Sequence, residues 1–228
     1  MHPVPMRRTA LDRLITDAGG QDLPDDNQMD QHLNDLLDEL AGLIDDITFT
    51  RTTDGYVAEA HFQVEGPSIT YDPAYTADSP DTDDMPFRTA CLLHELMHVS
   101  VDRQYTHPPG PEGAYWRSYN LHYGVGAVYG FVAQTNTIMA NLERIRTKAT
   151  SEGALSQAVR RHIGRRLDYA VVTPHVHYDT VLLDLLVYLR LKGLAGSQTY
   201  RYISGLSQEA RDRRTDSEGG PVPPAPAS

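Results

Sequence analysis

The segment at residues 94–98 constrains the fold of this chain more than any other part of the sequence. It has the sequence His-Glu-Leu-Met-His, and Asp84 and Pro86 upstream of it suit the N-cap and first turn of a helix. We therefore predict a helix from about Pro86 to about Gln104. Its apolar residues would bury most of its surface, so other elements must pack around it. The apolar residues that flank the histidines are Leu92, Leu93, Leu96 and Met97.

The two histidines of this segment are spaced as metal ligands. Residues four apart share one helix face, so His94 and His98 can both direct an imidazole nitrogen at one ion. Glu95 sits beside that face, where it can polarise a metal-bound water. Zinc lowers the pKa of such a water to about 7, and a glutamate can pass its proton to a leaving amine. The alternative is that both histidines form ordinary hydrogen bonds on a polar helix face and bind no metal.

The wider segment SITYDP…RTACLLHELMHVSVD resembles the active-site region of zincin metallopeptidases, over roughly residues 56–125. In that family an edge strand that binds extended substrate precedes the H-E-x-x-H helix. The resemblance implies zinc as cofactor, His94 and His98 as ligands, and Glu95 as general base. It also implies hydrolysis of peptide bonds, with a protein or peptide as substrate.

The chain departs from several zincin subfamilies. Val101 and Gln104 occupy the positions of the additional glycine and histidine of metzincins. No Asn-Glu-x-x-x-Asp sequence of the thermolysin type follows. The HVSV sequence is similar to aspzincins, although their G-T-x-x-D-x-x-Y-G signature is absent. The compact format also resembles zincin effectors and toxins delivered by bacterial secretion systems.

Catalytic zinc needs a third protein ligand beside its open position. Asp102 is four residues beyond His98, about 6 Å further along the helix axis, which is too far to share the ion comfortably. Glu112 would lie near the turn between two helices, distant from the ion. The candidates downstream of the motif are Asp102, His107, Glu112 and His122.

Two of these candidates are favoured equally. His107 follows His98 by nine residues, before a proline-rich break, and this spacing resembles that of the aspzincin third ligand with His in place of Asp. His122 would face residues 94–98 if helices at 86–104 and 112–148 packed as an antiparallel hairpin. We therefore predict His107 or His122 as the third zinc ligand.

Other polar residues have weaker assignments. His175 and His177 alternate in the strand-like sequence VVTPHVHYD and could line the cleft as oxyanion donors. The arginines of segment 153–167 are interpreted as a solvated helix face. Candidates for stabilising the tetrahedral intermediate are Tyr105, Tyr115, Tyr119 and Tyr123.

The periodicity of the rest of the chain predicts an α+β fold, with a small antiparallel sheet on a mostly helical, zincin-like body and the H-E-x-x-H helix at its centre. Strands are expected at 47–53, 56–64 and 68–71, with a hairpin turn at Asp54-Gly55. Helices are expected at 33–47, 112–148, 181–192 and 199–213. We predict a single domain over residues 1–213 and a disordered, proline-rich tail over 214–228.

Composition excludes some classes of function. The net charge of −11 argues against a protein that coats nucleic acid or a basic membrane-surface protein. The longest apolar run, at 181–189, is too short to span a bilayer. A single cysteine, Cys91, and the lack of an apolar stretch near the N-terminus favour a cytoplasmic protein, with signal-independent secretion left open. The alternatives to a peptidase are an inactive zincin-like scaffold and a helical interaction or regulatory module.

Overall fold

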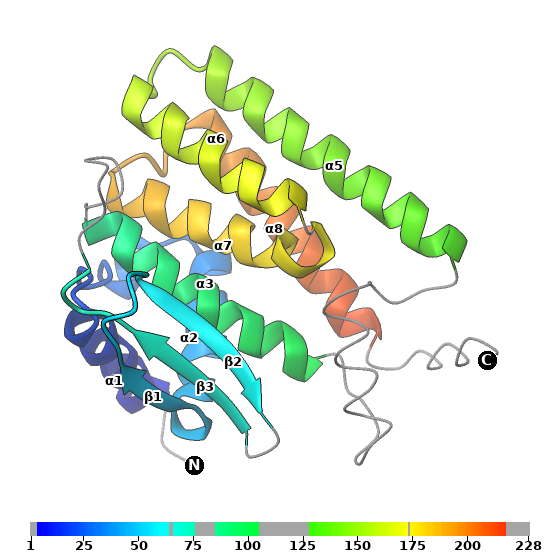
Figure 1. The fold of residues 1–228 in the computed structure, drawn as a ribbon. Helices are drawn as coiled ribbons and strands as arrows, with labels where there is room; N and C mark the ends of the chain where they lie inside the picture. Colours follow the sequence, from blue (N-terminus) through cyan, green and yellow to red (C-terminus); the bar gives the residue numbers. More distant parts are fainter. Residues whose placement is uncertain (1–3, 64–65, 76–84, 105–127, 173, 218–228) are drawn as a thin grey trace.

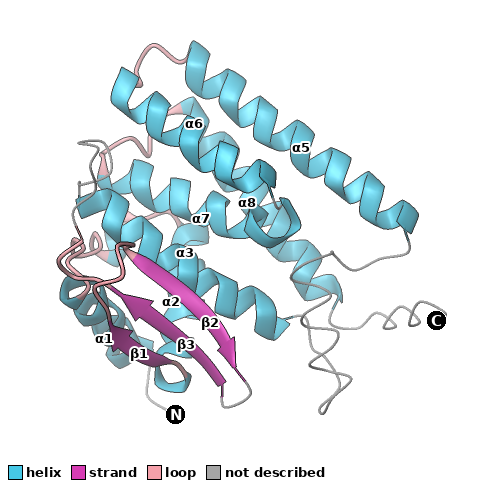
Figure 2. Ribbon diagram, in the orientation of Figure 1, coloured by secondary structure: helices cyan, strands magenta, loops and turns pink. Residues whose placement is uncertain are grey.

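The computed structural model describes residues 4–63, 66–75, 85–104, 128–172 and 174–217. Within these residues the chain is α+β, as predicted, with seven α-helices and one three-stranded sheet (Figures 1 and 2). The helices before the sheet are α1 (Val4–Asp17) and α2 (Gln31–Leu43), followed by a short 3-10 turn at Ile44–Asp46. The N-terminal helix α1 was not predicted.

The sheet is mixed rather than antiparallel, so the predicted meander is wrong in one strand. Its order is β1 (Thr48–Arg51), β3 (Gly66–Tyr71), β2 (Ala58–Gln63). Strands β2 and β3 are antiparallel, but β1 runs parallel to β3 and does not pair with β2. The Asp54-Gly55 turn therefore carries the chain past the position of β3. The central place goes to β3 because its Ile69 and Tyr71 are the buried apolar residues.

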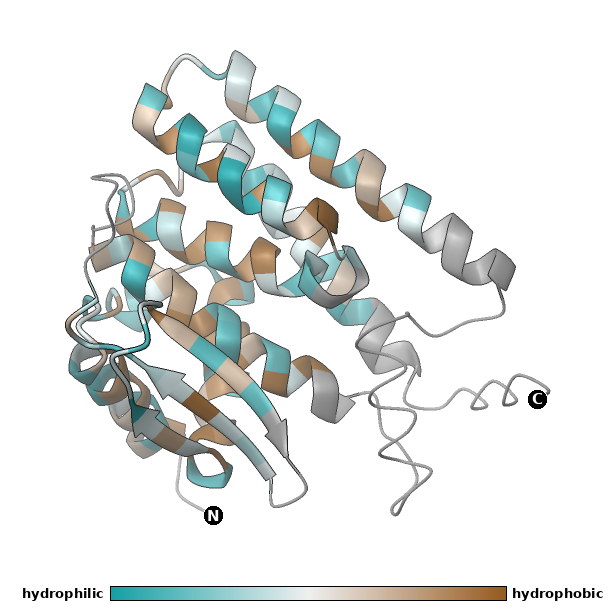
Figure 3. Cartoon of the chain, in the orientation of Figure 1, coloured by the Kyte–Doolittle hydropathy of each residue, from teal (hydrophilic) through white to brown (hydrophobic). Residues whose placement is uncertain are grey.

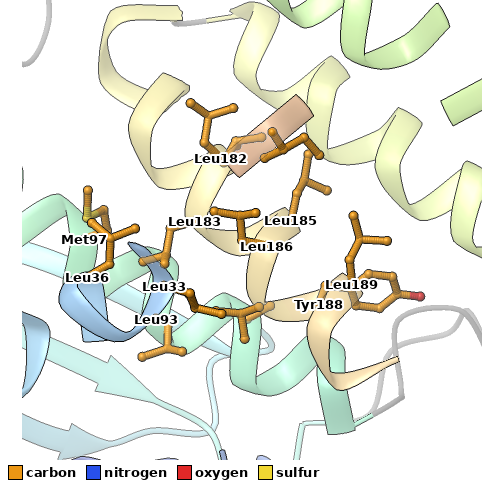
Figure 4. Packing of buried hydrophobic residues seen from close by; sticks show 14 of the residues in the cluster. Leu33, Leu36, Leu93, Met97, Leu182, Leu183, Leu185, Leu186, Tyr188 and Leu189 are labelled. Atoms are coloured by element: carbon orange, nitrogen blue, oxygen red, sulfur yellow. The ribbon is translucent and has the colours of Figure 1, made fainter. Parts of the chain in front are cut away.

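The H-E-x-x-H segment lies in α3 (Met85–Gln104), which closely matches the predicted helix. One side of α3 packs on β2 and β3, and another side packs on α7 (Pro174–Leu191). The contact between α3 and α7 is the most extensive between any two described elements. Leu93 and Met97 of α3 lie in the same buried cluster as the leucines of α7 and of α2 (Figure 4). The helix is central because its apolar residues need cover on both sides.

The remaining helices form the part of the molecule farthest from the sheet (Figure 1). They are α5 (Val128–Ser151), α6 (Gln157–Val172) and α8 (Gln198–Ser217), and α7 packs against all three. Figure 3 shows hydrophilic residues over much of α6 and apolar residues on α7. The expected hairpin partner of α3 was a helix over 112–148, whose residues before 128 lie outside the described part. Among the described helices, α7 makes the most extensive contact with α3.

The sequence VVTPHVHYD is helical, so its assignment as strand-like is wrong. Helix α6 ends at Val172 and α7 begins at Pro174, a residue that suits the first position of a helix. Local β-branched residues favoured a strand, but the buried residues of α7 recur at helical spacing. Those at its first turns are Tyr178, Val181, Leu182 and Leu185.

The end of α7 agrees with the prediction, whereas the end of α8 does not. Helix α7 stops at Leu191, and Gly193 adopts a φ of 71°, as the predicted stop at Lys192-Gly193 requires. Helix α8 continues four residues into the predicted tail, and residues 218–228 lie outside the described part. None of the helices in the described ranges combines the length and the apolar character needed to cross a membrane.

Candidate metal centre

Two histidines of α3 face the interior beside α7. His94 and His98 keep 1% and 7% of their surface exposed, and their ring centroids lie 4.8 Å apart. Their spacing of four residues places both on the side of α3 toward α7. Burial lowers the pKa of His94, and it lowers that of His98 well below the usual range. Repulsion from Arg166, and from His94 and His177 when these are protonated, lowers the pKa of His98 in the same direction. Both rings are therefore neutral, which is the state that binds a metal.

A third histidine comes from α7. The ring centroid of His177 lies 5.1 Å from that of His98 and 5.8 Å from that of His94. One ring nitrogen of each histidine lies within 4.8 Å of the others, so the three can hold one metal ion. The strand-like interpretation of its segment makes His177 a candidate oxyanion donor and not a ligand. A helix beginning at Pro174 would have put His177 on the face of the buried Val181 and Asp184, four and seven residues on.

The predicted third ligands are not among these residues. His107, His122 and the weaker candidate Glu112 lie outside the described part of the chain, as do the four tyrosines proposed for the intermediate. Asp102 belongs to α3 and His175 to the first turn of α7. The described residues therefore bring together His94, His98 and His177, and the prediction for His107 or His122 stays a prediction.

The two nitrogens of His94 have different surroundings. Its Nδ1 lies 3.1 Å from Nη2 of Arg166 and 3.6 Å from Oδ2 of Asp184. Its Nε2 is buried and has no hydrogen-bond partner among the described residues. A buried ring nitrogen without a partner costs free energy, and a metal ion would satisfy it. Nε2 is therefore the atom with which His94 can bind a metal.

The carboxylate of Glu95 is held against the sheet. Its Oε2 accepts a hydrogen bond of 3.0 Å from the backbone N–H of Ala60 in β2. Ala60 is paired with Ile69 of β3, yet its N–H points away from that partner, toward the edge of β2 that no other described strand pairs with, called here the free edge. Burial raises the pKa of Glu95 to about 7, although the Ala60 N–H and the charge of Arg166 oppose the rise. A carboxyl group with this pKa can both accept and return a proton near neutral pH.

Helix α6 contributes an arginine and a tyrosine to the centre. The interpretation of its arginines as a solvated face is wrong for Arg166, whose side chain is 16% exposed and forms an ion pair with the fully buried Asp184. Three residues further on, Tyr169 is 47% exposed, and its ring centroid lies 4.3 Å from that of His177. Burial, and then the charge of Glu95, raise the pKa of Tyr169, so its hydroxyl remains a hydrogen-bond donor. The sequence pattern predicts neither residue as part of the centre.

Comparison with protein-family models, with curated proteins and with solved structures gave no match. The functional interpretation therefore depends on the residues of the centre and on the resemblance of the H-E-x-x-H segment.

Proposed function

We propose that this chain is a zinc metallopeptidase of the zincin type, in which His94, His98 and His177 bind the metal and Glu95 is the general base. One observation carries the proposal: three histidines from two helices converge, with a buried carboxyl group one residue from the first of them. The convergence supports a metal site, and the carboxyl group supports hydrolysis over a purely structural role.

The donor set fits zinc. Three imidazole nitrogens are a ligand set of catalytic zinc, which leaves a fourth position for water or substrate. The Nε2 of His94, which has no hydrogen-bond partner among the described residues, supports a metal at this place. Zinc held there would supply the Lewis acid that polarises the scissile carbonyl and acidifies the attacking water.

Glu95 would move the proton. Its carboxylate takes a proton from the attacking water and delivers it to the nitrogen of the leaving amine. The hydrogen bond from Ala60 fixes one carboxylate oxygen and leaves the other for the water. The same contact ties the base to the free edge of β2.

The free edge of β2 supports an extended peptide as the substrate. In the register with β3, the backbone groups of Ala58, Ala60 and Phe62 face away from the sheet. An extended segment can add to such an edge through main-chain hydrogen bonds, which depend little on side-chain identity. Because Glu95 contacts this edge, a peptide bound there passes beside the base.

Tyr169 is the residue that we assign to the oxyanion. Replacing it by Phe removes the hydroxyl and keeps the ring against His177, so we expect kcat to fall by about 10²-fold with bound zinc unchanged. Steady-state kinetics on a cleaved peptide, with metal analysis of the same sample, measure both quantities. Tyr202→Phe in α8 is the matched control, and an equal loss of kcat in both variants would contradict the assignment.

The proposal as a whole is tested by metal analysis and metal removal. Protein purified without a histidine tag should contain close to one equivalent of zinc and should cleave members of a diverse peptide library. A chelator should abolish cleavage, and added zinc should restore it. Zinc far below one equivalent, together with no uptake of added zinc, would exclude the peptidase and favour the helical interaction module.

A further inference from the structure

Exposed apolar side chains gather at the C-terminal end of α6, beside the metal centre. The described residues include six exposed large apolar side chains, and three of them are in the last four residues of this helix. They are Tyr169, Val171 and Val172, which are 47%, 39% and 78% exposed. The exposed residues of the two turns before them are all charged: Arg161, Arg165 and Asp168. A single exposed apolar residue needs no explanation, but a group of them next to a metal centre is typical of a ligand-binding surface.

Only one of the two valines adjoins the tyrosine. Val172 follows Tyr169 by three residues, so the two side chains are neighbours on one face of α6. Side chains of a helix lean toward its N-terminus, which brings Val172 over the turn that carries Tyr169. Val171 follows Tyr169 by two residues and points to a different side of the helix. Tyr169 and Val172 are called here the apolar pair.

The apolar pair borders the place where a metal would bind. The ring centroid of Tyr169 lies 4.3 Å from that of His177 and 6.0 Å from that of His94. Residues that are neighbours on one helix face have Cβ atoms about 5–6 Å apart. An extended peptide advances by about 3.3 Å per residue. When its scissile bond lies at the metal, a side chain one or two residues away from that bond is therefore within reach of Val172.

We propose that the apolar pair is a specificity subsite, which binds a large apolar side chain of the substrate, such as Leu or Phe, within two residues of the scissile bond. This inference rests on the proposed function, because it takes the centre as that of a peptidase. A bound leucine would remove its own surface, that of Val172 and part of the Tyr169 ring from water, which is favourable. A charged side chain at the same place would lose hydration and gain no partner from the pair.

The test measures kcat/KM on a matched series of peptides. A peptide that the wild type cleaves is synthesised again with Leu, Ala or Asp at each of the two positions on either side of the cleaved bond, one position at a time. At one of these positions we expect the Leu peptide to exceed the Ala peptide by about 10-fold, which is within the range of hydrophobic subsites. The Asp peptide should be the poorest of the three at that position.

Two substitutions of Val172 should change this preference. Val172→Asn should lower kcat/KM for the Leu peptide by about 10-fold, so that Leu and Ala become similar, and Val172→Lys should shift the preference to Asp. Because Val172 is 78% exposed, both variants should fold and keep their zinc. Val171→Asn is the matched control: it makes the same change one residue away, on a different side of α6, and should keep the wild-type preference. Tyr169→Phe keeps the ring, so it should keep the preference even though kcat falls.

The outcomes separate the subsite from the proposed function. An unchanged preference in both Val172 variants, or an equal change in Val171→Asn, would overturn the subsite and leave the peptidase in place. A wild type that cleaves all the peptides equally well, or that prefers Asp, would do the same. A wild type that binds zinc and cleaves no peptide would overturn the proposed function and the subsite with it.

Discussion

Replacement of Glu95 by Gln is expected to lower kcat for peptide hydrolysis by about 10²–10⁴-fold, the usual contribution of a general base, and to leave zinc at one equivalent. Glutamine has nearly the shape of glutamate, and its side-chain oxygen can still accept the hydrogen bond from Ala60. The variant therefore keeps the contact between α3 and β2 and loses only the ability to exchange a proton. Kinetics on a peptide that the wild type cleaves, with zinc measured on the same sample, give the result.

The control for this variant is Glu59→Gln. Glu59 is an exposed residue of β2, and its charge contributes to the raised pKa of Glu95. Removing this charge changes the field at the base without removing the base, so kcat should stay close to that of the wild type. If the Glu95→Gln variant has the kcat of the wild type, Glu95 is not the base. Zinc and partner binding without hydrolysis in the wild type would favour the inactive scaffold.

The parts of the fold that could be predicted are those whose signal is local. The span of α3 follows from an N-cap, a proline and the spacing of its apolar residues, and the end of α7 follows from Gly193. The pairing of β1 with β3 is set by burial of Ile69 in the centre of the sheet, a tertiary effect that outweighed the local hairpin signal at Asp54-Gly55.

In the candidate site, too, local features could be predicted from the sequence and tertiary contacts could not. The spacing within His94–His98 is a helical property, so it could be predicted without a structure. Arg166 and His94 are 72 positions apart, and only the packing of α6, α7 and α3 brings them together. One error was local, however, because Pro174 marked the start of a helix and the segment was interpreted as a strand. That error removed His177 from the candidate ligands.

The variant His177→Ala therefore tests the metal ligand that the structure indicates and the sequence pattern did not predict. Loss of one of three ligands should reduce zinc to a small fraction of one equivalent. Zinc that is present at 1,000 times its dissociation constant stabilises the folded state by about 4 kcal/mol, so the variant should lose most of that stabilisation. Metal analysis and thermal unfolding with and without added zinc measure the two effects.

The matched variants decide which histidine completes the centre. His61→Ala removes an imidazole that contacts Thr70 on the sheet, at 3.0 Å, and should leave zinc unchanged. His107→Ala and His122→Ala test the ligands predicted from spacing. If either of these loses zinc while His177→Ala retains it, the third ligand lies in the segment that follows α3. If only His177→Ala loses zinc, the metal binds between α3 and α7. The ion would then link two helices whose contact is the most extensive among the described elements. Removal of the ion should therefore lower the stability of the protein as well as its activity.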